Sequence, residues 1–157
     1  ADIPSVRLAR DFVYLAVIMD VFTRAIRGWS LSRDLNTQLT LAALQAALAL
    51  CLPEIHHSDQ GVQYLSMRYT ERLADAGIEP SVGSRGDSYD NALVESVIGL
   101  FKAEVIRRKG PWRSLDAVEF ATLIWVDWFN HRRLLGPIGY VPPAEYEAHY
   151  YEQVAVA

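Results

Sequence analysis

Residues 85–109 read RGDSYDNALVESVIGLFKAEVIRRK, a polar segment with a glycine that leads into a helical pattern. Ser88 or Asp90 could cap the first turn, because a short polar side chain accepts hydrogen bonds from the free N–H groups there. Apolar residues then recur at the i, i+3, i+4 spacing of a buried stripe. The stripe consists of Leu93, Val94, Val97, Ile98, Phe101 and Val105. The pattern predicts a helix with one face in the core.

The other face of this predicted helix is polar. Steps of four and seven residues return to one face of a helix, so Asn91, Glu95 and Lys102 are expected in line. One helix glutamate is usually a solvated surface residue. Two aspartates add to its significance: Asp59 follows a short strand-like segment in HHSDQGVQY, and Asp2 precedes a strongly strand-like block. Three carboxylates near one sheet edge would supply the hard oxygen ligands that Mg²⁺ prefers.

Composition and charge limit the function classes. The chain has 157 residues, 51% of them hydrophobic, which suits one globular domain with a substantial core. Its single cysteine, Cys51, rules out an internal disulfide framework and suits a reducing cytoplasm. No apolar run is long enough to span a bilayer. The formal net charge of −4 argues against nucleic-acid binding by overall charge alone.

The charge is unevenly distributed along the chain. From Lys102 to Arg133 there are seven cations and four acids. A local basic patch would explain this excess, and so would an ordinary solvated helix face.

Five strands are expected. The run FVYLAVIM is typical of a buried strand, and the segment before it should be short or at an edge because Pro4 cannot donate to a ladder. Asp20 should accept hydrogen bonds in the turn that follows this run. The strands are expected at residues 1–11, 12–19, 25–31, 54–57 and 78–82.

Five helices are expected between and after these strands. The fourth, beginning after a Ser114 cap, is apolar almost all round, so it should be buried or pack on another subunit. The last should be a single turn after a proline-rich tail. The first three are expected from Asn36 or Thr37 to about Leu50, over residues 66–76, and along the helix of Glu95. This order predicts an α/β fold with a mixed five-stranded sheet flanked by helices and ligands at the carboxyl ends of its strands.

The residues resemble those of a known family. Asp2, Asp59 and Glu95 resemble the DDE catalytic triad of the retroviral-integrase superfamily, and the 35 residues between Asp59 and Glu95 match the spacing of its integrase-like branch. HHSDQGVQY and GDSYDNALVES are similar to the blocks around the second and third acids in bacterial insertion-sequence transposases of the IS-three group. FVYLAVIMDVFTRAIRGWSLS and WFNHRRLLGPIGYVPPAEYE resemble further blocks, so the resemblance covers essentially the whole chain.

The resemblance implies a ribonuclease-H-like fold and a single catalytic core over residues 1–157, without the N-terminal region that recognises transposon ends. It implies cleavage of DNA at a transposon end and transfer of the 3′-OH to another phosphodiester. Two Mg²⁺ or Mn²⁺ ions are expected with DNA bound, where Asp2 bridges both, Asp59 holds one and Glu95 the other. An inactive remnant that keeps DNA binding or assembly is an alternative, and so is a ribonuclease-H-like nuclease that joins no strands.

DNA contacts and partners follow from the same resemblance. Lys102 would contact a phosphate near the scissile bond, which is a positioning role. Asn91 could orient the substrate or face solvent, and Arg85 in the preceding loop is a further candidate DNA contact. The expected partners are transposon-end and target DNA and further copies of the chain, in the bacterial cytoplasm at the nucleoid. The adjacent His56 and His57 should point to opposite faces of a strand, which argues against a zinc site.

Overall fold

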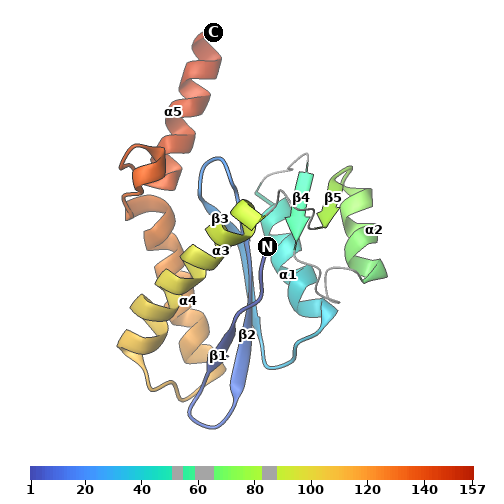
Figure 1. The fold of residues 1–157 in the computed structure, drawn as a ribbon, viewed down its shortest axis with the longest axis vertical. Helices are drawn as coiled ribbons and strands as arrows, with labels where there is room; N and C mark the ends of the chain where they lie inside the picture. Colours follow the sequence, from blue (N-terminus) through green and yellow to red (C-terminus); the bar gives the residue numbers. More distant parts are fainter. Residues whose placement is uncertain (51–54, 59–65, 83–87) are drawn as a thin grey trace.

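The structure is a computed structural model that describes residues 1–50, 55–58, 66–82 and 88–157. Three strands come first, helices and strands then alternate as far as β5, and the described elements after β5 are helical (Figure 1). The strands are β1 (Ser5–Arg7), β2 (Phe12–Met19), β3 (Ile26–Ser32), β4 (Ile55–Ser58) and β5 (Glu79–Val82). The α-helices are α1 (Thr37–Leu48), α2 (Met67–Asp75), α3 (Ser88–Phe101), α4 (Leu115–Arg132) and α5 (Pro143–Val156). A π-helical segment, η1 (Lys102–Arg107), continues α3, and a short 3₁₀ helix, η2 (Gly136–Ile138), precedes α5.

The strands form two hydrogen-bonded groups. β2 lies between β1 and β3 in an antiparallel sheet, and β4 pairs with β5 in parallel. The α/β class and both strand orientations are as predicted, but the prediction of one continuous five-stranded sheet is wrong for the strands described. β1 has only three residues, and Pro4 before it has no N–H to donate. A further strand at this edge of the sheet could therefore form only a few backbone hydrogen bonds.

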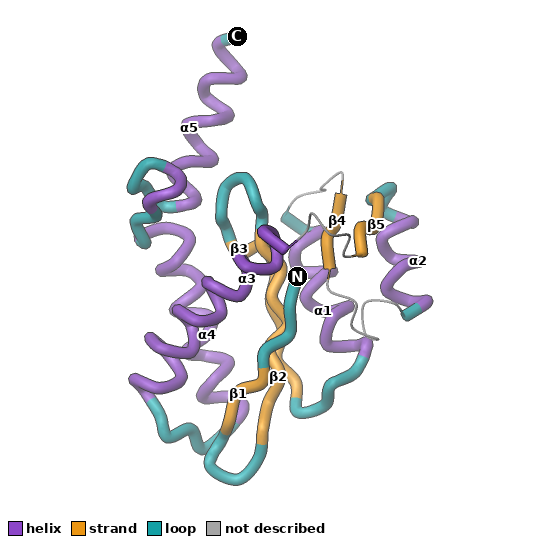
Figure 2. The backbone as a smooth tube through the Cα atoms, viewed as in Figure 1, coloured by secondary structure: helices purple, strands orange, loops and turns teal. Residues whose placement is uncertain are grey.

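Helices cover both faces of the antiparallel sheet (Figure 2). Along β2, successive side chains point to opposite faces, so the buried residues of one strand serve two cores. One core joins β2 to α3 and α4 and includes Val13, Leu15, Val17, Val97, Ile98, Phe101, Val118, Trp125 and Phe129. The other joins β2 to α1 and α2 and includes Ala16, Ile18, Leu39, Ala43, Leu44, Tyr69 and Leu73.

The approach of α1 to β3 is unusually close at Gly28. A Cβ atom at this position would lie 2.2 Å from the backbone oxygen of Ala43 and 2.8 Å from the backbone nitrogen of Ala47. Only a glycine therefore lets the helix backbone rest directly on the strand.

The predicted cap at Ser114 is confirmed, and the predicted helix starts at Asn36 and Ser66 are caps as well. The side chains of Asn36, Ser66 and Ser114 each accept a hydrogen bond from the backbone N–H three residues later. Gly77 follows α2 with φ +71°, the left-handed conformation common just after a helix.

Two predictions about helix ends are wrong. α3 already begins at Ser88, so Asp90 lies inside its first turn and does not cap it. The chain ends in a helix of 14 residues and not in a single turn, because Pro143 suits a first helical position and no glycine or further proline follows. Cys51 lies outside the described residues.

The end of α3 changes to a wider helical turn at Lys102–Arg107. Glu104 in this segment accepts hydrogen bonds from the Trp125 indole, at 2.8 Å, and from Arg133 Nη1, at 2.6 Å. Partial burial would raise the pKa of Glu104, but the bonds from Arg133 and Trp125 outweigh this effect and hold its pKa below the usual value. The wide turn is thus attached to α4 and to the residue that follows α4.

Candidate active site

Asp2 extends the edge of the sheet beyond β1. Its backbone exchanges two hydrogen bonds with Val17 of β2, at 3.2 and 3.0 Å. Ala1 and Ile3 pack against the core on the α1 side. Because alternate residues of an extended chain point to opposite faces, the Asp2 side chain lies on the other face, which is the face covered by α3. Its Oδ1 accepts the Ile3 N–H at 2.7 Å, which restrains the carboxylate.

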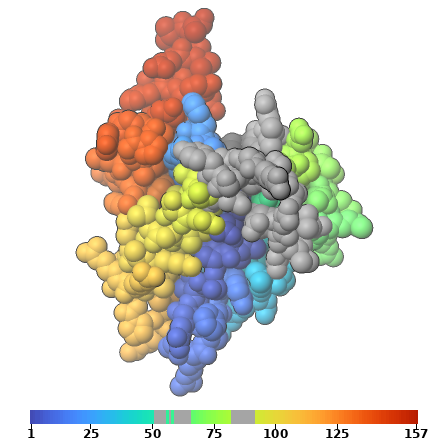
Figure 3. Space-filling model, viewed as in Figure 1, coloured from blue at the N-terminus to red at the C-terminus, as the bar shows by residue number. Residues whose placement is uncertain are grey.

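Glu95 lies on the part of α3 that packs against this position. Val97 and Ile98 line one small apolar cavity together with Val17, the strand partner of Asp2. Glu95 itself is exposed and lies outside the buried stripe of the helix, as predicted. Figure 3 shows the N-terminal residues (blue) and the coloured part of α3 (yellow-green) on the same face of the molecule. The fold therefore brings the segments of two predicted acids to one region.

The other predicted site residues are described only in part. Asp59 and Arg85 lie outside the described residues, and Asn91 is described as part of α3 without its side chain. Lys102 is half-buried in the first position of the wide turn. It follows Glu95 by seven residues of helix, a rise of about 10 Å at 1.5 Å per residue.

The strand that leads to residue 59 is held by a buried polar pair. His56 of β4 and Tyr69 of α2 are both buried, and His56 Nε2 lies 2.7 Å from the Tyr69 hydroxyl. Burial raises the pKa of Tyr69, so the hydroxyl keeps its proton and can donate to the imidazole. This pair anchors β4 directly before residue 59.

The candidate site can be compared with a metal site by the kind of donor atoms that its residues offer. Among the residues that the structure describes, which omit residue 59, no group of three or more His, Cys, Asp or Glu side chains could hold a metal ion. Asp2 and Glu95 contribute carboxylate oxygens, the donors that suit Mg²⁺ and Mn²⁺. The donor set therefore fits such an ion provided that Asp59 completes it.

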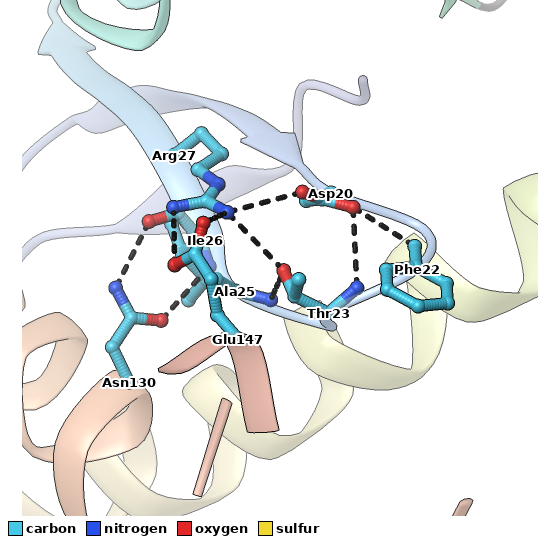
Figure 4. Close-up of polar contacts among 8 residues, drawn as sticks. All are labelled: Asp20, Phe22, Thr23, Ala25, Ile26, Arg27, Asn130 and Glu147. Atoms are coloured by element: carbon cyan, nitrogen blue, oxygen red, sulfur yellow. Dashed lines mark hydrogen bonds and ion pairs between the residues drawn. The ribbon is translucent and has the colours of Figure 1, made fainter. Parts of the chain in front are cut away.

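A polar network fixes the turn between β2 and β3 (Figure 4). As predicted, Asp20 accepts hydrogen bonds in this turn, from the N–H groups of Phe22 and Thr23. Its other oxygen pairs with Arg27 at 3.1 Å, and Arg27 Nη1 also bonds to Glu147 of α5 at 3.1 Å. Burial would raise the pKa of Asp20, but these bonds outweigh it and keep its pKa below the usual value.

The same network includes a helix side chain. Asn130 of α4 accepts the Ile26 N–H at 2.8 Å and donates to the Ile26 carbonyl at 2.9 Å (Figure 4). The partners lie 104 residues apart in the chain, so no local sequence signal could have revealed this bond. It aligns α4 with β3 behind the candidate site.

α4 has two apolar faces, and only one is buried. Trp125 and Phe129 are among the residues that pack inward, as expected for a helix that is apolar all round. The outward face exposes Phe120 by 65%, Ile124 by 48% and Trp128 by 42%, and Leu123 lies between them. Helical spacing of apolar residues over both faces was the sequence signal for this surface.

None of the helices in the described part of the chain is long and apolar enough to span a membrane.

The chain matches two family models, each described as "Integrase core domain", over residues 1–88 and 76–143. It is 51% identical to the transposase for insertion sequence element IS629 of Shigella sonnei, over 98% of this chain and 52% of that protein. It is 33% identical to the transposase for element IS904 of Lactococcus lactis, over 86% of this chain and 54% of that protein. The chain thus spans about half the length of these relatives.

Solved structures show the same fold at low sequence identity. The catalytic core domain of BIV integrase superposes with a TM-score of 0.73 at 15% identity, over 97% of this chain and 95% of that one. The HTLV-2 integrase catalytic core domain in complex with magnesium, in a trimeric form, superposes with a TM-score of 0.66 at 18% identity, over 92% and 91% of the two chains. The similarity extends over almost the whole chain, so the predicted integrase-like, ribonuclease-H-like fold is confirmed.

Proposed function

This chain belongs to the integrase core family of insertion-sequence transposases, and we propose that it is a metal-dependent polynucleotidyl transferase core. It cuts DNA at a transposon end and joins the freed 3′-OH to a second phosphodiester. One observation carries the proposal: Asp2 pairs with Val17 of β2, and Val17 lines one cavity with Val97 and Ile98 of α3, the helix that bears Glu95. The proposed site of action is the bacterial cytoplasm, on nucleoid DNA.

Asp2, Asp59 and Glu95 form the proposed catalytic set. Their carboxylates are ionised at neutral pH and can hold two Mg²⁺ or Mn²⁺ ions. When bound, such ions stabilise negative charge on the attacking and leaving oxygens of an in-line displacement at phosphorus. The magnesium in the HTLV-2 core domain supports this assignment. The Ile3 N–H bond orients Asp2, and the His56–Tyr69 pair holds the strand before Asp59.

The proposed DNA contacts surround this set. Lys102 holds a phosphate next to the scissile one, since it follows Glu95 on the same helix face by about two turns. Asn91, one turn before Glu95, orients the same strand, and Arg85 contacts the backbone from the preceding loop. These contacts position the DNA and do not read its sequence.

The test is strand transfer with a pre-cleaved transposon-end duplex in Mg²⁺ or Mn²⁺. We expect joined product from the wild-type chain and only background from Asp59→Asn and Glu95→Gln. Glu119→Gln, which removes an exposed acid from α4, is the matched control and should retain activity. Hydrolysis without joined product would show a nuclease instead, and Mn²⁺ binding that persists in Asp59→Asn would refute the assigned ligands.

We also propose that the chain functions as a homo-oligomer through the outward face of α4. Its large apolar residues, about half exposed, offer on the order of 400 Å² of apolar surface. A patch of this size on a soluble domain marks an interaction surface. Asp116 lies near one end of the face and Arg132 lies at the other, so an antiparallel second copy would place opposite charges together. The HTLV-2 core domain, solved in trimeric and dimeric forms, supports self-association.

Sedimentation equilibrium tests the oligomer. We expect concentration-dependent association that Phe120→Ser with Ile124→Ser abolishes, because both side chains are exposed and their loss leaves the core intact. Val154→Ser, an exposed apolar residue of α5, is the control and should associate normally. A wild-type chain that stays monomeric, or a double variant that associates normally, would refute this interface.

A further inference from the structure

One end of the molecule is built from two connections that are far apart in the sequence. The turn between β1 and β2 and the segment between α3 and α4 lie together at the lower end of Figure 1. The Ala9 N–H donates to the Trp112 carbonyl at 3.0 Å, which joins the two connections directly. The buried Trp112 indole donates to the Ile106 carbonyl at 3.0 Å. The backbone of this end is therefore fixed by hydrogen bonds.

The side chains that this end presents to solvent are mainly cationic. Five exposed cations flank the two hydrogen bonds: Arg10, Arg107, Arg108, Lys109 and Arg113. We call them the basic end. Arg10 follows Ala9 and Arg113 follows Trp112, so the Ala9–Trp112 bond brings these two together from positions 103 residues apart. The excess of cations noted between residues 102 and 133 is thus joined by a cation from the N-terminal part of the chain.

The acids nearest to the basic end are mostly engaged elsewhere. Asp11 pairs with Arg33 at 2.7 Å, and Glu104 accepts two bonds from Arg133. Asp116 is the exposed acid nearest in sequence to Arg113. The positive charge here is therefore largely uncompensated, in a chain whose formal net charge is −4. A local field of this sign attracts polyanions even where the overall charge repels them.

The position of the basic end relates it to the candidate active site. It is the far end of the helix that carries Glu95: twelve residues separate Glu95 from Arg107, a rise of about 18 Å at 1.5 Å per residue. Lys102 lies between them. Duplex DNA repeats about every 34 Å, so 18 Å corresponds to about half a helical turn. Within one turn the backbones of both strands cross the same side of a duplex, so a duplex whose reacting phosphate lies at Glu95 and whose axis follows α3 would present the backbone of the complementary strand near the basic end.

We propose that the basic end is a second phosphate-binding surface that holds the backbone of duplex DNA about half a turn from the reacting phosphate. It contributes affinity and orientation without sequence discrimination, since its groups are charges at a fixed backbone and not base-reading pairs. This inference rests on the proposed function for the identity of the duplex, but the binding itself requires no metal.

The test is DNA binding by the full chain in EDTA, measured by fluorescence anisotropy over a series of salt concentrations. The variant is Arg10→Gln, Arg107→Gln, Lys109→Gln and Arg113→Gln together. It spares Arg108, whose charge acts on Glu104. The control is Arg68→Gln with Arg72→Gln on α2, which covers the opposite face of the sheet. Thermal unfolding of each variant shows whether it is folded.

Each lost phosphate contact lowers the slope of log K against log salt by about 0.9. We expect the magnitude of the slope to fall by up to about 3.6 for the fourfold variant, which removes four such contacts, and to stay unchanged for the control. The loss should be equal for a transposon-end duplex and for an unrelated duplex, whereas a loss with only one of them would refute a backbone surface. An unchanged slope in a folded variant would overturn the inference, and wild-type strand transfer would then leave the proposed function standing.

Discussion

Replacement of Gly28 by alanine tests the close packing of α1 on β3. The added Cβ would lie 2.2 Å from the Ala43 oxygen, 2.8 Å from the Ala47 nitrogen and 2.9 Å from the Ala47 Cβ. An ordinary contact needs about 3.4 Å, so the helix must retreat by about 1 Å. Overpacking typically costs 1–3 kcal/mol. Because the opposing atoms include helix backbone, which cannot rotate away, we expect a loss of about 3 kcal/mol.

Gly99 supplies the matched control within the same chain. It is exposed on α3, and a Cβ there would have no atom within 4 Å. Gly99→Ala should therefore gain helix propensity, about 1 kcal/mol. In a domain of this size each kcal/mol moves Tm by about 2–4 °C. We expect Gly28→Ala to melt about 6–12 °C below the wild type, and Gly99→Ala about 2–4 °C above it.

Thermal unfolding followed by circular dichroism measures both values. A Gly28→Ala variant that melts with the wild type would refute the close approach of α1. A fall in Tm for both variants would show that the chain penalises any added methyl group, and the geometric explanation would fail. Denaturant titration at room temperature provides an independent measure of the same free energies.

Three further predictions concern polar contacts. The folded-state pKa of Asp20 is lowered, so the ionised carboxylate stabilises the folded state. This contribution is complete above the unfolded pKa of about 4 and is lost as pH falls through the folded-state pKa. Asp20→Asn should therefore lower the free energy of unfolding measured in urea near pH 7 and leave it unchanged near pH 2. Trp125→Phe keeps an aromatic ring but removes the bond to Glu104 and part of the buried indole, so the urea midpoint should fall by an amount equivalent to about 2–4 kcal/mol, with an unchanged slope. Asn130→Ala removes both bonds to the buried backbone of Ile26 and should cost about 2–4 kcal/mol in the same assay, whereas a cost below about 0.5 kcal/mol would contradict that pairing.

Local physics made much of this fold predictable. The apolar stripe of α3, the run of β2 and the caps at Asn36, Ser66 and Ser114 are written within a few residues of sequence. The division of the strands into two groups was not predictable in this way. Strand pairing joins residues far apart in the chain, and a three-residue β1 gives little indication of which neighbour it pairs with.

The candidate site was likewise predictable where it depends on local sequence and not where it depends on contacts between distant parts of the chain. The apolar stripe placed Glu95 outside the core, but its candidate role came from the two aspartates and the family resemblance. The orientation of Asp2 follows from alternation once its pairing with Val17 is known. The basic end was only half visible, because Arg10 reaches it through a hydrogen bond between Ala9 and Trp112. The predicted catalytic, metal-binding and DNA-binding roles remain predictions for every candidate site residue, and Asp59 and Arg85 also lie outside the described residues.

The wide turn at Lys102–Arg107 has a consequence for variation in length. A π-type turn accommodates one more residue than an α turn while the helix continues on both sides. A homologue that lacks one residue here is therefore expected to keep a continuous helix, in which the part that carries Glu95 and the part that ends in the basic residues stay in line. Such a deletion would remove the hydrogen bonds of Glu104 to Trp125 and Arg133. The extra residue therefore makes the helix less regular but attaches it to the neighbouring helix.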